Sequence, residues 1–390
     1  MFSLQVQGKF LFFLFFLGAN VALAVGDAFD NIIVEDRRTF AVLDPHGPFR
    51  NGSQRFEPTP NVTLTPPYFQ VFDDRFRDIL GPAPSIRVIV ENDTFPFAHD
   101  APMWVPSTDD VFFSGGRTVG RPVSKINLHD LATTQTGLIN FIIIPLGDDV
   151  QINNGGTLFR GDLLLVTTGS GPLPPSLVRV NPLPPFNDTV ILNNYYGRQF
   201  NSLNDAKIHP VSRAIFFTDT TYGFLNGFRP PPLIPNQVYR FDADTGEVRV
   251  VADGFTQPNG VAFSPDGETA YIADSGETEG VLNGNDQTKP ATIYAFDVRP
   301  ETQVFGNRRV FAYIDSGVPD GLTLDTNGNL YVGCGDGTEV FDPNGTLLGK
   351  VSLGVGSANM VFAGKGRLII MADTKIYLAT IAAEGVNLNL

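Results

Sequence analysis

Five short segments of this chain open on a side chain that offers an oxygen donor. The donors are Asp100, Asn204, Asn259, Asp320 and Asn359. Carboxylate and amide oxygens are the ligands that Ca²⁺, and with fewer protein ligands Mg²⁺ or Mn²⁺, prefer in proteins. Each residue taken alone would more often cap its own turn. Four of them meeting at one point would instead form a site for a divalent cation, with Asp100, Asn204, Asn259 and Asp320 as ligands.

Behind each leading residue lies the same local pattern of two short strands around a tight turn. The clearest copy spans residues 257–274, in which Val261 and Phe263 alternate with small or polar neighbours. Asp266 and Gly267 then supply the turn, because Asp bonds its own backbone and Gly accepts a positive φ. Looser copies follow the other leading residues, and each pair of strands is expected to place its leader in the same local position.

The repeat predicts an all-β fold, a six-bladed β-propeller with a central metal channel. The interval between Asp100 and Asn204 is about twice a blade-sized unit, so a sixth copy is expected there, beginning at Asn154. Residues equivalent by rotation about the propeller axis would converge at one end of the channel. Ring closure is expected to pair a strand at 86–90 with the last blade near 375–380. A β-sandwich is the competing fold, but it does not explain why one leader type precedes each hairpin.

The N-terminus resembles a secretory leader, with Lys9 before an apolar run and Ala22-Leu23-Ala24 as the cleavage motif. We expect a signal peptide at 1–24, an irregular extension at 25–85 and the propeller at 86–390. A secreted, extracellular glycoprotein is predicted, with no membrane association after cleavage. The sequence contains five N-x-[ST] glycosylation motifs, at Asn51, Asn61, Asn92, Asn187 and Asn344.

The net charge argues against nucleic-acid binding, and the single cysteine excludes an intrachain disulfide. The formal net charge is −14, from 27 Lys and Arg against 41 Asp and Glu, so the chain repels nucleic acid. One cysteine, Cys334, forms no intrachain disulfide, and its place in a strand favours a buried, unreactive thiol.

The segments around the leading residues resemble those of the gluconolactonase/regucalcin-like (senescence marker protein) family. The matching motifs are His99-Asp-Ala-Pro-Met-Trp104, Asn201-Ser-Leu-Asn-Asp205, Phe217-Thr-Asp-Thr-Thr-Tyr-Gly223, Gln257-Pro-Asn-Gly260 and Val318-Pro-Asp-Gly321. The secreted, glycosylated form with His before the first acid looks like fungal lactonohydrolases. The resemblance implies one divalent cation in the channel, Ca²⁺ or alternatively Zn²⁺, Mg²⁺ or Mn²⁺, and hydrolysis of sugar-type lactones.

Carried over position by position, the resemblance assigns the metal ligands to the same four leaders. Two departures affect the expected site. The family usually has Glu where this chain has Asp100, which is one methylene shorter. An arginine that binds substrate in animal members would fall at Ser202, so substrate recognition does not transfer.

The resemblance and the residues together predict a lactonase that acts on aldono- or pantoyl-like lactones. The cation would stabilise the oxyanion formed when water attacks the carbonyl. Asp320 is the first choice for the base, with His99 and Asp205 as further catalytic candidates. Asn204, Asp219, Tyr222 and Trp104 are expected to contact substrate. Two alternatives stay open: a calcium-dependent phosphotriesterase or arylesterase using the same site, and a non-enzymic propeller with a structural cation.

Overall fold

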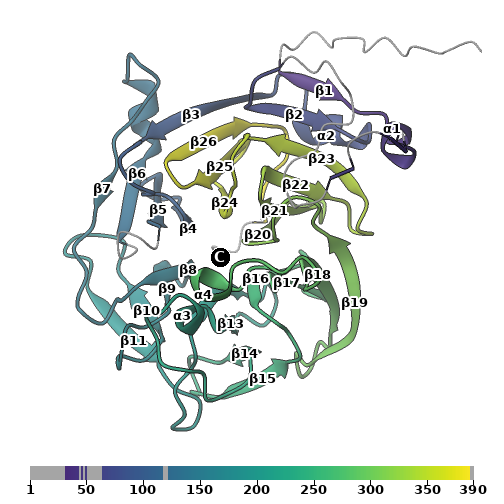
Figure 1. Cartoon of the computed structure of the whole chain (residues 1–390). Coiled ribbons are helices and arrows are strands. Elements are labelled where there is room, and N and C mark those ends of the chain that lie inside the picture. The colour runs from purple at the N-terminus through teal and green to yellow at the C-terminus, as the bar shows by residue number, and fades with distance from the viewer. Residues whose placement is uncertain (1–30, 44, 47–48, 51–63, 117–121, 387–390) are drawn as a thin grey trace, which may run out of the picture.

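The computed structural model describes residues 31–43, 45–46, 49–50, 64–116 and 122–386. The predicted signal peptide at 1–24 and the motifs at Asn51 and Asn61 lie outside these residues. Six antiparallel sheets surround a central axis as the blades of a propeller (Figure 1). The all-β, six-bladed fold predicted from the repeat is therefore confirmed.

Each of the first three blades begins on its innermost strand and runs outward. Blade 1 comprises β4 (Asp100–Val105), β5 (Asp110–Ser114), β6 (Val123–Asn127) and β7 (Ile142–Ile143). Blade 2 comprises β8 (Asn153–Phe159), β9 (Asp162–Thr167), β10 (Ser176–Val180) and β11 (Asp188–Leu192). Blade 3 comprises β12 (Leu203–Ile208), β13 (Ile215–Asp219), β14 (Gln237–Phe241) and β15 (Val248–Ala252). Blade 2 is the expected sixth copy between Asp100 and Asn204.

The remaining blades follow the same order. Blade 4 comprises β16 (Pro258–Phe263), β17 (Thr269–Asp274), β18 (Thr292–Val298) and β19 (Phe305–Tyr313). Blade 5 comprises β20 (Leu322–Leu324), β21 (Leu330–Cys334), β22 (Gly337–Phe341) and β23 (Leu347–Ser352). Blade 6 comprises β24 (Asn359–Phe362), β25 (Arg367–Ala372), β26 (Lys375–Thr380) and, from the start of the chain, β3 (Ser85–Glu91).

The ring is closed by β3, which pairs antiparallel with β26. The register runs from Ser85 opposite Thr380 to Glu91 opposite Lys375. The closure predicted between 86–90 and 375–380 is therefore confirmed. Because this strand is far from β26 in the sequence, closure ties the two ends of the propeller together, with β3 as the outermost strand of blade 6.

Aromatic side chains fill the space between neighbouring blades. Between blades 3 and 4, Phe216 packs on Phe263 and stacks on Phe305, with ring centroids 4.9 and 5.5 Å apart. Offset or edge-on packing of this kind adds to the burial of apolar area. Each blade therefore buries both faces, one against each neighbour, which keeps the inner strands fixed around the axis.

Part of the N-terminal extension forms regular structure on the outside of blade 5. Strand β2 (Tyr68–Val71) is buried along its length and pairs with β23, and β1 (Ile32–Val34) pairs parallel with β2. Two short helices accompany them, α1 (Arg38–Ala41) and α2 (Arg75–Leu80), and α2 packs against β23.

Among the residues that the structure describes, three short helical segments occupy loops between the blade strands. A 3-10 helix spans Leu128–Ala132 in blade 1. Helices α3 (Tyr222–Leu225) and α4 (Gly280–Asn283) follow the second strands of blades 3 and 4 and contact each other. In Figure 1 both lie near the axis of the ring, so they stand at the entrance to the channel.

Candidate functional site

The leading residues of the repeat meet at one end of the central channel. Asp100, Asn204, Asn259 and Asp320 all line a single cavity of about 520 Å³. Three lie within the first two residues of an innermost strand, and Asp320 lies two residues before β20. The fold therefore gathers the four residues that the sequence singled out as metal ligands.

Irregular pairing at the start of the inner strands helps to direct these side chains. The pairing register shifts beside Asp100 in β4, and across Asn204 in β12 and Asn259 in β16. A β-bulge bends its strand and re-aims a side chain that regular pairing would direct into a sheet face. These bulges explain how residues on buried strands come to line the channel.

Two further asparagines hold the Asp100 carboxylate. Asn154 Nδ2 donates to Asp100 Oδ2 at 3.0 Å, and Asn359 Nδ2 donates to Asp100 Oδ1 at 2.7 Å. The backbone N–H of Ala101 also donates to Oδ1, at 2.8 Å. Asn154 and Asn359 begin the inner strands of blades 2 and 6, so all six blades contribute a leading residue to this region. Asp100 Oδ1 therefore accepts two hydrogen bonds, whereas Oδ2 accepts one and keeps a lone pair for a further partner.

Asn204 gives the clearest indication that a ligand binds in this cavity. It is 4% exposed, and its Oδ1 has no hydrogen-bond partner among the described residues. A buried acceptor without a partner costs about 1–3 kcal/mol, so native proteins rarely leave one. Asn259, in contrast, donates from Nδ2 to Ser275 Oγ at 3.0 Å, which fixes its amide and leaves its Oδ1 as the group available to a ligand.

Glycines behind the leading residues let neighbouring inner strands approach closely. A Cβ at Gly260 would clash with the backbone oxygen of Asp320, and a Cβ at Gly321 would clash with the Asn359 side chain. The first contact joins blades 4 and 5, and the second joins blades 5 and 6. These glycines therefore set the spacing between leading residues that come from different blades.

The structure pairs His99 with Asp373, a residue that the sequence analysis did not select. His99 Nδ1 lies 2.7 Å from Asp373 Oδ1, and both residues line the cavity beside Asp100. Asp373 closes the second strand of blade 6, so its position in the repeat was visible. Its contact with His99 arises only because blade 6 adjoins blade 1 when the ring closes.

Asp205 and Asp219 lie behind the cavity, and neither is among the residues that line it. Asp205 is 2% exposed and accepts a hydrogen bond from Val261 N–H at 3.2 Å. Burial raises the pKa of its carboxyl to about 6. Asp219 accepts from the N–H groups of Asn201 and Ser202, at 3.0 and 2.8 Å, and burial raises its pKa to about 7. Asp219 thus holds the loop that leads to Asn204. Because it lies behind the cavity, its position does not support the predicted contact with substrate.

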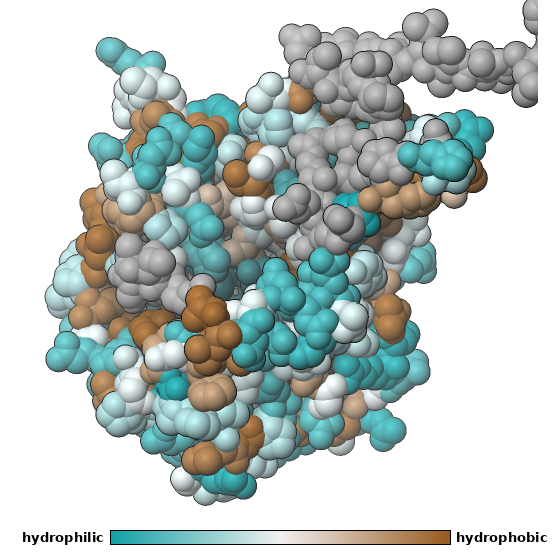
Figure 2. All heavy atoms as spheres, in the orientation of Figure 1, coloured by the Kyte–Doolittle hydropathy of each residue, from teal (hydrophilic) through white to brown (hydrophobic). Residues whose placement is uncertain are grey.

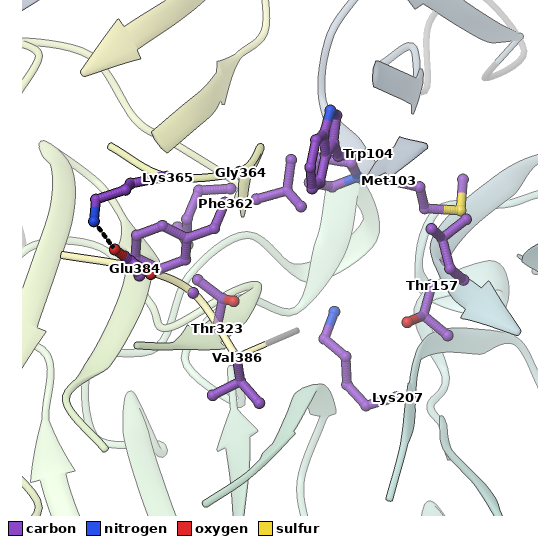
Figure 3. A pocket seen from close by; sticks show the side chains of 16 residues that line it. Met103, Trp104, Thr157, Lys207, Thr323, Phe362, Gly364, Lys365, Glu384 and Val386 are labelled. Carbon is purple, nitrogen blue, oxygen red and sulfur yellow. Dashed lines mark ion pairs between the residues drawn. The ribbon is translucent and has the colours of Figure 1, made fainter. Parts of the chain in front are cut away.

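The two aromatic residues expected to contact substrate lie at opposite ends of the channel. Tyr222, at the start of α3, lines the cavity with the leading residues, and its hydroxyl donates to the Ser275 backbone oxygen at 3.1 Å. Trp104 lies at the far end of β4 and lines a different cavity of about 270 Å³, together with Lys207 and Phe362 (Figure 3). Its indole N–H donates to Asp109 Oδ1 at 2.7 Å. The structure does not bring Trp104 to Asp100, because four strand residues separate them by about 13 Å.

A second group of potential metal ligands lies in blade 5, but a lysine side chain occupies the position next to them that a cation would take. Cys334, Asp336 and Glu339 lie close together and are buried. Lys350 Nζ lies 2.7 Å from Glu339 Oε1 and 3.6 Å from Asp336 Oδ2. Its ammonium supplies the positive charge there, and burial raises the pKa of the Cys334 thiol. These observations agree with the structural role expected for Cys334.

Comparison with known proteins identifies similar chains. Residues 183–372 match the model of the SMP-30/Gluconolactonase/LRE-like region. The lactonohydrolase oryL of Aspergillus oryzae is 31% identical over 310 residues, which cover 74% of this chain and 68% of that protein. The gluconolactonase of Zymomonas mobilis is 26% identical, with 77% of this chain and 82% of that protein covered.

Solved structures share the fold. A gluconolactonase from Xanthomonas campestris superimposes with a TM-score of 0.63 at 24% identity, covering 80% of this chain and 93% of that one. At this identity the likeness supports the propeller architecture alone.

Proposed function

Because the chain belongs to the SMP-30/gluconolactonase/LRE-like family, we propose that it is a divalent-metal-dependent lactonase of the aldono- or pantoyl-lactone type. The reaction is hydrolysis of the cyclic ester bond, with water as the second substrate. The observation that carries this proposal is the cavity where Asp100, Asn204, Asn259 and Asp320 converge, with the Asn204 amide oxygen buried and without a hydrogen-bond partner in the part of the chain that the structure describes.

The donor set fits a hard divalent cation. Two carboxylates and two amide oxygens suit Ca²⁺, and Mg²⁺, Mn²⁺ or Zn²⁺ are the alternatives. Asp100 would be held in place by Asn154 and Asn359 from the two adjoining blades. When bound, the cation supplies Lewis acidity to the lactone carbonyl and to the oxyanion that follows water attack.

The protein's own part in the reaction is to orient the water and accept its proton. Asp320 is one base candidate, but an oxygen that ligates a cation is a weaker base. His99 is the better placed base, because the Asp373 carboxylate at Nδ1 fixes the ring orientation and stabilises the imidazolium. Nε2 is then the atom that accepts the proton. When the ester C–O bond breaks, this proton passes to the leaving alkoxide and gives the open hydroxy acid.

We also propose that the protein is secreted and glycosylated. Asn187 and Asn344 are exposed and lie near strand ends, so the side chain of each is accessible to glycosylation. None of the helices in the described part of the chain combines the length and apolar character needed to span a bilayer. Mass spectrometry of the protein from a eukaryotic host, before and after glycosidase treatment, tests the occupancy of these motifs and the N-terminus after residue 24.

Hydrolysis followed by pH-stat titration tests the activity. We expect turnover of aldono- or pantoyl-type lactones that is lost in EDTA and restored by one divalent metal. Asn259→Ala should lower the metal affinity, whereas Trp104→Phe, at the other end of the channel, serves as the matched control. Lactone turnover that survives both EDTA and Asn259→Ala would refute a metal-dependent reaction at this cavity. Hydrolysis of phosphotriesters together with no hydrolysis of any lactone would instead support the alternative phosphotriesterase.

A further inference from the structure

Apolar side chains lie at the entrance of the candidate site, which we call its mouth. The leading residues form the polar base of the same cavity, which we call its floor. Tyr222, Phe228 and Val281 line the cavity that contains the leading residues. Val281 and its neighbour Leu282 are 66% and 58% exposed, and α4 contributes no buried residue. Figure 2 shows apolar side chains gathered over this region, beside the central hollow. We call Tyr222, Phe228, Val281 and Leu282 the apolar ledge.

The ledge is held in place by contacts that do not use its apolar groups. The Val281 N–H donates to Asn226 Oδ1 at 3.2 Å, which joins α4 to the loop after α3. At the base of the α4 loop, Thr278 forms an isolated β-bridge with Asn285, and Lys289 pairs with Glu279. The exposed valine and leucine are therefore presented by an ordered loop, so their exposure does not come from a loose chain.

Floor and mouth differ in the chemistry that they can recognise. The floor presents carboxylate and amide groups to the ester. Ser202, at the position where the family resemblance would place a substrate-binding arginine, is buried, and its Oγ accepts a hydrogen bond from Gly223 N–H at 3.0 Å. A polyhydroxylated arm that packed against Phe228 and Val281 would lose hydrogen bonds to water that these two side chains cannot replace. A hydrocarbon arm loses nothing there and buries apolar area.

We propose that the apolar ledge is a specificity surface for a hydrocarbon substituent on the lactone ring. The preferred substrates are then alkyl-substituted lactones, whose ester lies on the polar floor and whose arm lies along α3 and α4. This inference rests on the proposed lactonase function, and it ranks alkyl-substituted lactones above polyhydroxylated aldonolactones as substrates of the same site.

The test is a series of γ-butyrolactones that carry ring alkyl groups from methyl to hexyl, with glucono-lactone as the polyhydroxylated comparison. Full burial of one methylene corresponds to about a fourfold gain in kcat/KM. Because the ledge stays partly open to water, we expect about a twofold gain per methylene. Val281→Ser and Leu282→Ser should each lower the hexyl-to-methyl ratio of kcat/KM, together by about threefold or more.

Val310→Ser is the matched control, because Val310 is also 66% exposed but lies on the outer strand of the same blade. It should leave the ratio at the wild-type value. The inference is overturned if kcat/KM does not rise with the length of the alkyl arm. It is also overturned if Val281→Ser and Leu282→Ser leave the hexyl-to-methyl ratio of kcat/KM unchanged. Loss of binding to phosphatidylcholine vesicles in those variants, at an unchanged ratio, also overturns it and assigns the ledge to a lipid surface. Failure to hydrolyse any lactone, including glucono-lactone, overturns the proposed function itself.

Discussion

Replacing Asn204 by leucine should change the stability of the protein in opposite directions with and without a divalent cation. Asn204 is nearly fully buried, and its Oδ1 has no hydrogen-bond partner among the described residues. In EDTA the wild type carries this unsatisfied acceptor, at a cost of about 1–3 kcal/mol. Leucine has a similar size and no such acceptor. Asn204→Leu should therefore raise the free energy of unfolding in EDTA by about 1 kcal/mol or more.

With the cation bound, the order of stability should reverse. A ligand at about 100 times its Kd stabilises the folded state by about 2.7 kcal/mol. The wild type gains this amount, whereas Asn204→Leu lacks one of the four donors and gains much less. The variant should then be less stable than the wild type in millimolar calcium. Urea unfolding followed by tryptophan fluorescence, in calcium and in EDTA, measures both differences.

Asn236→Leu is the control for this experiment. Its Oδ1 also has no hydrogen-bond partner within the described ranges, and its Nδ2 donates to the Thr256 backbone oxygen at 2.6 Å, but it does not line the cavity. Its effect on unfolding should be the same in both media. If Asn204→Leu behaves like this control, with equal shifts in calcium and EDTA, the amide oxygen of Asn204 is not a metal ligand and the reasoning fails.

Three further substitutions test other parts of the structure. Asp373→Asn should lower kcat by about 100-fold or more with little change in KM, because it removes the charge that stabilises the His99 imidazolium; an unchanged kcat would leave Asp320 as the base. In the wild type the free energy of unfolding should fall as the pH rises from about 4.5 to about 8, and Glu339→Gln should abolish this fall. Burial raises the pKa of this carboxyl from 4.5 to about 8, so over that range only the folded chain holds the proton, and stability is lost as the pH rises; denaturation curves that keep the wild-type slope would contradict this. Gly321→Ala should reduce activity although it removes no functional group, since its Cβ would displace Asn359 from Asp100; a crystal structure of the variant with Asn359 unmoved would refute that cause.

The sequence predicted the fold through local signals that recur. The polar leader, the hairpin and its turn lie within about eighteen residues of each other, so each blade's inner strands can be read without long-range information. The closing strand at 86–90 was also predictable, because the last blade of a propeller needs a fourth strand, and a strand from the start of the chain can supply it. The structure at 32–34 and 68–71 was not, since those strands depend on an outer edge that only the folded blade 5 provides.

Within the candidate site, sequence position predicted which residues converge but not which atoms they use. Asn154 was a weak copy of the repeat, yet its Nδ2 joins Asp100 to the Asn204 backbone oxygen, at 3.0 and 3.1 Å. Trp104 follows Asp100 closely in the sequence but lies at the far end of the channel, because an extended strand carries it away. Contacts between blades depend on the rotation from one blade to the next, and no single repeat encodes that rotation.

The closing aspartates show how one repeated position can acquire two roles. Asp219 in blade 3 and Asp274 in blade 4 each accept two backbone N–H groups from the loop that enters the inner strand. Burial raises the pKa of both carboxyls, and the hydrogen bonds that they accept from backbone N–H groups oppose this rise. Asp373 occupies the same position in blade 6, but its side chain is 55% exposed and contacts His99 of blade 1 across the ring closure. A carboxylate that faces the cavity and orients a histidine can act in proton transfer, whereas one committed to its own loop fixes a ligand in place. The chemistry of this cavity thus depends on the one closing aspartate that pairs with a histidine of the neighbouring blade.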